Sequence, residues 1–123
     1  MRYGMWMVLM LLTACSGEAP APLLPPPMFK GDVAQGKEIY QEHCARCHGA
    51  HLRGDARNGP PLLNEVYHPG HHADLSFYQA VRNGVVQHHW HFGNMPAQPK
   101  VTPEMAGHVV AYVRAEQRRA GIF

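Results

Sequence analysis

The sequence predicts an all-α fold with long irregular loops, built as one domain around a small core. Two segments, 33–43 and 103–119, carry helix start signals and apolar residues at helical spacing. Apolar residues make up 46% of the 123, but some of them belong to an N-terminal segment that we expect to lie outside the fold. A core of the remaining size usually needs a disulfide, a metal or a cofactor for stability.

The first predicted helix follows Asp32, which is a suitable N-cap. Gly36, Tyr40 and Cys44 then recur at helical spacing, so we expect this helix to run into the cysteines with its apolar face toward a cofactor. A glycine inside a helix costs up to about 1 kcal/mol relative to alanine. Gly36 therefore predicts the close approach of another helix.

The last predicted helix begins with Thr102 as N-cap and Pro103 in the first turn. Its arginines near the C-terminal end, before Gly121, are favourable for the helix dipole. The apolar stripe that we expect to face the core consists of Ala106, Val109, Val110 and Val113, with Tyr112 beside it.

Charge gives no indication of a nucleic-acid partner. The net charge is +2 at pH 7 with the histidines neutral, and the lysines are only Lys30, Lys37 and Lys100. Strong electrostatic steering toward a partner is not predicted either.

Residues 1–14 are typical of a secretory signal. The apolar run Met5–Leu12 is shorter than the roughly 20 residues that a membrane span requires. The following Leu12–Cys15 resembles the lipobox of bacterial lipoproteins, which implies cleavage before Cys15 and lipidation of that cysteine. An ordinary signal peptide with an incidental cysteine is the alternative. Two or more acyl chains would anchor the protein stably.

Residues 15–30 are predicted to form a lipidated cysteine and a linker. Ser16 favours the outer membrane by analogy with enteric bacteria. The linker excludes helix and favours extended polyproline II conformation because of its prolines. They are Pro20, Pro22, Pro25, Pro26 and Pro27. The domain is then expected to span residues 31–123.

The segment Cys44–His48 has the C-x-x-C-H pattern of covalent haem attachment. Two thiols at this spacing add to the two vinyl groups of one haem, and the adjacent histidine ligates the iron. A redox C-x-x-C needs no following histidine. A zinc site needs a second pair of ligands, and the sequence has no second cysteine pair, because the third cysteine is Cys15. A stray dithiol beside a histidine is the alternative. Attachment outside the membrane agrees with the export signal.

Met95 is the predicted sixth iron ligand. It precedes Pro96 in a loop just before the last helix, where a thioether can point across the ring. Met105 falls at the start of that helix and Met28 lies in the linker. The alternative is that Met95 packs in the core while a histidine, or nothing, occupies the sixth position.

Over residues 31–123 the chain resembles a class I cytochrome c. The resemblance rests on the order of a helix, C-x-x-C-H, Gly59-Pro60-Pro61-Leu62, a middle helix, a Met-Pro loop and a last helix. It implies three main helices around one haem. It also implies that the Pro60 carbonyl accepts a hydrogen bond from His48, which makes that histidine a better donor to iron.

The same resemblance places the middle helix at Asp74–Asn83, with Asp74 as its cap and Gly84 as its stop. It further implies that the terminal helices cross, with Gly36 against Tyr112. The lysine ring of the mitochondrial type is absent, so the partners of that type are not carried over.

Ten histidines are many for this length. Apart from His48 and three scattered histidines, the remaining six form two groups in the sequence. They are His68, His71 and His72, and then His88, His89 and His91. A polar, aromatic-lined rim around the haem is one interpretation, because the second group includes Trp90 and lies close in sequence to Met95. A second metal site, with copper as the candidate ion, is the other; its ligands would come from His71, His72, His88, His89 and His91.

We therefore expect a single-electron carrier with a positive reduction potential, and no enzyme activity, because His48 and Met95 close the iron to substrate. Its partners would be redox proteins, and its location periplasmic or at the cell surface, anchored through Cys15. One alternative is an open iron site of a peroxidase-like protein or sensor. Another is a copper-handling lipoprotein with an accessory haem.

Overall fold

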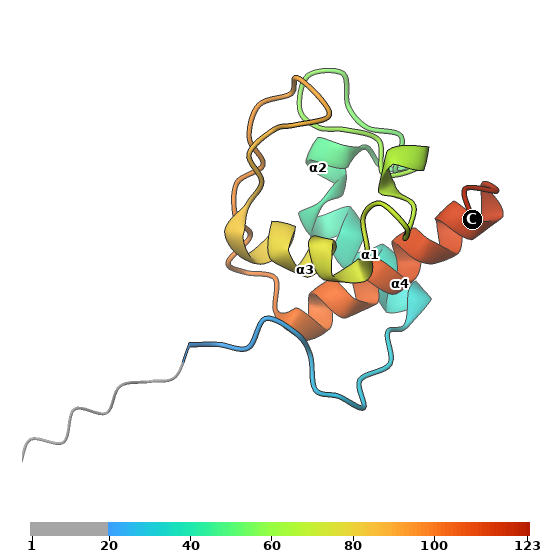
Figure 1. The fold of residues 1–123 in the computed structure, drawn as a ribbon. Coiled ribbons are helices and arrows are strands. Elements are labelled where there is room, and N and C mark those ends of the chain that lie inside the picture. Colours follow the sequence, from blue (N-terminus) through green and yellow to red (C-terminus); the bar gives the residue numbers. More distant parts are fainter. Residues whose placement is uncertain (1–19) are drawn as a thin grey trace, which may run out of the picture.

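The computed structural model describes residues 20–123, and in this range the regular elements are helices. They are α1 (Val33–His43), α2 (Ala45–His48), the 3₁₀ helix η1 (Glu65–Tyr67), α3 (Asp74–Asn83) and α4 (Pro103–Arg119). Long loops join them (Figure 1). The predicted all-α fold is confirmed. No helix in residues 20–123 has the length and apolar character needed to cross a membrane. The predicted signal segment and Cys15 lie outside the described residues.

Helices α1 and α4 cross, as Figure 1 shows for the cyan and orange-red helices. Gly36 lies at the crossing, against His108 and Tyr112 of α4. A Cβ atom placed on Gly36 would lie 2.6 Å from the carbonyl carbon of His108 and 2.9 Å from Tyr112 Cβ. The Tyr40 and Tyr112 rings continue the contact, with centroids 5.5 Å apart. The predicted helix contact at Gly36 is therefore present, and it requires a residue without a side chain.

The first predicted helix differs from the structure in two respects. Its buried residues Gly36 and Tyr40 pack against α4, so its apolar face is not turned toward a cofactor. It ends at His43 as predicted, but it does not continue to Cys47, which lies in a separate short helix, α2. The reason for the first difference is that the crossing with α4 uses the same face of α1.

The core lies between α1, α4 and the loop around residues 52–62. Its buried members are Tyr40, Leu52, Leu62, Val109, Tyr112 and Val113. The predicted stripe of α4 is buried along its length. The predicted caps are confirmed at Asp32, which accepts a hydrogen bond from the Gln35 N–H, and at Thr102, which accepts one from Met105.

Helix α3 spans the predicted residues and ends at Gly84, which has a φ of +74°. The prediction of Asp74 as its cap was wrong, because Ala73 occupies the N-cap position. Asp74 lies in the first turn instead, where its carboxylate accepts a 2.7 Å hydrogen bond from Arg114 Nε. This buried arginine of α4 draws the carboxylate toward α4 and away from the end of its own helix.

The last residues of the predicted linker pack on the domain. Residues 20–30 contain no helix, and the Phe29 N–H donates to Pro26 O at 2.8 Å in a turn. The Phe29 ring lies edge-on to His108 of α4 with centroids 4.9 Å apart. Figure 1 shows this blue segment passing close to the N-terminal end of α4. The docked part of the chain thus begins slightly before residue 31.

Candidate functional site

One cavity of about 670 Å³ collects the residues that the sequence singled out for a haem. Its lining includes Cys44, Cys47, His48, Pro60 and Met95. The walls come from α2, the loop around residue 60, α3 and the segment that follows α3. In Figure 1 that last segment, in gold and orange, faces α2.

Helix α2 brings both thiols to this cavity. It is a single turn that Cys44 precedes as the N-cap residue, and residues three apart on a helix share a face, so Cys44 and Cys47 lie on the same side. Both are half-buried free thiols. Burial, with a smaller contribution from Cys47, raises the pKa of the Cys44 thiol to about 11. Gly49, with a φ of +77°, ends the turn.

His48 is oriented by a hydrogen bond to the backbone. Its Nδ1 lies 2.9 Å from the carbonyl oxygen of Pro60, and since a carbonyl only accepts, Nδ1 donates. Nε2 is then the nitrogen with a free lone pair. Burial lowers the pKa of His48, and the Pro60 contact offsets part of this effect. Burial therefore favours the neutral form of the ring, which is the form that binds metals.

The loop that carries Pro60 is packed tightly against the cysteines. A Cβ atom on Gly59 would lie 2.7 Å from the Cys47 carbonyl oxygen. Gly59 is buried, so no side chain fits at this position. The Gly-Pro sequence thus sets the distance between the loop and α2, and with it the bond to His48.

Met95 is fixed by its backbone. Val85 and Met95 form an isolated antiparallel bridge, with N–H···O distances of 2.9 Å in both directions. Gly84 packs under this bridge, since a Cβ atom there would lie 2.5 Å from the Met95 carbonyl oxygen. The end of α3 therefore determines where the half-buried Met95 side chain enters the cavity lining.

The sequence indicated Trp90 near the haem rim, but several other residues of the site were missed. Tyr67 and Trp90 line the cavity, and Trp90 Nε1 donates to the Tyr67 hydroxyl at 3.1 Å. Arg114 and Gln117 of α4 support them, since both donate to the Tyr67 carbonyl. A signal for these two existed, because they continue the helical spacing of Val110 and Val113 onto the buried face.

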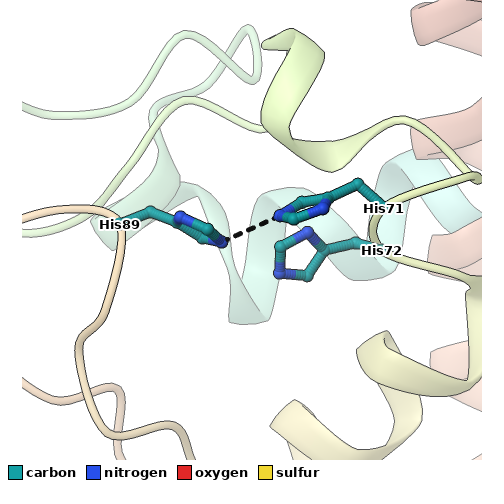
Figure 2. Close-up of side chains that lie close together, drawn as sticks. All are labelled: His71, His72 and His89. Carbon is teal, nitrogen blue, oxygen red and sulfur yellow. Dashed lines mark hydrogen bonds between the residues drawn. The ribbon is translucent and has the colours of Figure 1, made fainter.

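The predicted histidine groups are only partly brought together. Ligand atoms of His71, His72 and His89 lie within 4.8 Å of one another (Figure 2). His88 stands beside them, with its ring centroid 4.4 Å from that of His89. His91 is exposed and is not part of this group of three.

The residues present fit a covalently attached haem. The cavity size falls within the roughly 300–1,000 Å³ that is usual for cofactor sites. Two adjacent thiols, an imidazole with a free Nε2 and a thioether are the groups needed for attachment and for two axial ligands. Apolar side chains complete the walls, among them Leu62, Phe77, Val81 and Val109.

Comparison with known proteins gives one family and three curated relatives. The family described as "Cytochrome C oxidase, cbb3-type, subunit III" matches residues 31–113. The cbb3-type cytochrome c oxidase subunit FixP of Sinorhizobium medicae is 33% identical over 57 residues, or 44% of this chain and 20% of the relative. No solved structure gives a significant match.

The other two relatives cover more of the chain. The cytochrome bc1 complex cytochrome c subunit of Corynebacterium efficiens is 28% identical over 100 residues, covering 73% of this chain and 28% of the relative. Cytochrome c of Theileria annulata is 28% identical over 94 residues, covering 76% of this chain and 82% of the relative. The chain thus spans less than a third of the first two relatives.

Proposed function

We propose that this protein, a class I c-type cytochrome with covalently bound haem c, transfers single electrons with His48 and Met95 as the axial ligands. The chain belongs to the family described as cytochrome c oxidase, cbb3-type, subunit III. The observation that carries this proposal is the shared cavity of both side chains with Cys44 and Cys47.

Cys47 of the one-turn helix α2 and its N-cap residue Cys44 would hold the haem through thioether bonds. When bound, the haem supplies a one-electron couple between ferric and ferrous iron. His48 would ligate through Nε2, since Nδ1 is engaged by Pro60 O at 2.9 Å. This second bond fixes the ring and raises its basicity as a ligand.

Met95 would supply the sixth ligand. Its backbone is held by the bridge to Val85, so the loop need not reorganise between oxidation states. A thioether ligand raises the reduction potential relative to a second histidine. We expect a positive midpoint potential and an iron closed to exogenous ligands. A carrier of this kind needs no substrate site, in agreement with the prediction that the protein is not an enzyme.

The partners we propose are redox proteins. Support comes from relatives whose names place them in a cbb3-type oxidase and a bc1 complex. Residues 1–14 would export the chain to the periplasmic or cell-surface side, and lipidated Cys15 would anchor it. Residues 16–30 would then link the anchor to the domain at 31–123.

A pair of leucine variants of the haem-loaded protein tests the axial ligand. Leucine conserves the volume of methionine but cannot ligate iron. Met95→Leu is expected to lower the midpoint potential and to let the ferrous protein bind carbon monoxide, because the sixth position opens. Met105→Leu, in the first turn of α4, serves as control and should leave both unchanged. Equal behaviour of the two variants would contradict the role of Met95.

A further inference from the structure

Three imidazoles from two separate segments converge on one point of the surface. His71 and His72 follow η1, whereas His89 belongs to the segment after α3. Figure 2 shows the rings of His71 and His89 pointing toward one another, with the His72 ring next to them. We propose that His71, His72 and His89 form a second metal site, which binds a divalent transition-metal ion independently of the haem.

The spacing of the nitrogens agrees with shared coordination. Nε2 of His71 and Nε2 of His89 are 3.2 Å apart. With metal–nitrogen bonds of about 2.0–2.1 Å, two ligands of one tetrahedral ion lie roughly 3.3 Å apart. An ion between the two rings would therefore require little movement of either side chain. A single N–H···N hydrogen bond gives a similar separation, so ion binding is the property to be measured.

A hydrogen bond to the backbone fixes which nitrogen of His72 can bind a metal ion. Its Nδ1 lies 2.8 Å from the carbonyl oxygen of Val66, so Nδ1 carries the proton and Nε2 has a free lone pair. A histidine ligand whose other nitrogen donates to a carbonyl is the usual arrangement in metal sites. His88 has the same feature, with Nδ1 2.9 Å from Val86 O, and stacks beside His72 at a centroid distance of 6.0 Å.

The donor set indicates the kind of ion. Three imidazole nitrogens suit Zn²⁺, Cu²⁺ or Ni²⁺, whereas Mg²⁺ and Ca²⁺ prefer oxygen ligands. Among these ions Cu²⁺ is expected to bind most tightly. His71 and His89 are exposed, so ions reach the site from solvent. Three protein ligands also leave a coordination position for water.

The site lies at the rim of the cavity described above, because His72 and His89 line it together with His48 and Met95. A bound divalent cation would favour the reduced, less positive iron and raise the haem potential. This electrostatic effect, unlike the binding itself, depends on the proposed electron-transfer function.

Calorimetric titration of the haem-loaded protein with Cu²⁺, and separately with Zn²⁺, tests the site. The wild-type protein should bind one ion at this site, and the double variant His71→Ala/His89→Ala should lose about 100-fold or more in affinity, since it lacks two of three ligands. His91→Ala removes an exposed histidine two positions from His89 and should bind like the wild type. An unchanged haem spectrum in each variant shows that the fold is intact.

Two results would overturn the metal site: undiminished binding in the double variant, or an equal loss in His91→Ala. This test is independent of the test of the axial ligand, because the Met95→Leu variant keeps all three imidazoles and should still bind the ion. Zn²⁺, which has no redox chemistry, should raise the haem potential of the wild type but not of the double variant. An unshifted potential with zinc bound would refute the electrostatic effect.

Discussion

Replacing Gly36 by alanine tests the helix crossing on which the domain is built. In an exposed helix this change stabilises by about 1 kcal/mol. Here the new Cβ would lie 2.6 Å from the His108 carbonyl carbon and 2.9 Å from Tyr112 Cβ, against 3.4–4 Å for ordinary contact. The His108 carbonyl oxygen would lie closer still, so the helices would have to part by more than about 1 Å, and overpacking of this kind costs about 1–3 kcal/mol.

We take the upper end of that range because the clash is with backbone, which cannot rotate away. After the gain in helix propensity is subtracted, Gly36→Ala should destabilise the protein by about 2 kcal/mol. Urea denaturation of the haem-loaded protein, followed by circular dichroism, measures this directly. With a slope of about 2 kcal/mol per M, the midpoint should fall by about 1 M.

Ala34→Gly provides the matched control, since Ala34 is an exposed position of the same helix. It should lose about 1 kcal/mol through helix propensity alone. The two changes are opposite in chemistry, and yet both should destabilise. A neutral or stabilising Gly36→Ala would show that α1 and α4 do not approach as closely as described, and would refute the reasoning.

Two further predictions concern the site and its support. Gly84→Ala should weaken the bond between Met95 and iron, because the new Cβ would meet the Met95 carbonyl oxygen. Loss of the far-red absorption of the ferric protein measures this effect. Gly93→Ala is the control, since Gly93 has a similar φ of +88° but no atom within 4 Å, and it should leave that absorption intact. Arg114→Met should cost about 2–3 kcal/mol in urea denaturation, since the His72 carbonyl and the Asp74 carboxylate lose their donor and the Tyr67 carbonyl keeps only Gln117. Arg119→Ala removes a surface ion pair with Glu116 and should cost less than about 1 kcal/mol.

Local signals in the sequence predicted the helices well. Asp32 and Thr102 cap helices where expected because capping depends on residues only three positions apart. Asp74 shows the limit of such reasoning. Its carboxylate could cap α3, but Arg114, forty residues away in sequence, binds it instead. Long-range partners of this kind leave no local trace.

The sequence predicted the residues that attach and ligate the haem, but not the side chains that line the rest of the cavity. The C-x-x-C-H pattern is contiguous, so Cys44, Cys47 and His48 are recognisable without a structure. The contact between Tyr67 and Trp90 joins residues 23 positions apart and depends on how two loops pack. The histidines show the same limit: their number was evident, but only the structure selects His71, His72 and His89 from the two groups.

We propose above all that a six-coordinate haem iron is held by His48 and Met95 in the cavity that both residues line. Optical spectra of the haem-loaded wild-type protein, oxidised and then reduced under carbon monoxide, test it most directly. We expect a low-spin ferric spectrum with the weak far-red band of methionine ligation, and a reduced spectrum that carbon monoxide does not alter. A high-spin ferric spectrum, or ready binding of carbon monoxide, would contradict it and indicate an iron open to substrates or gases.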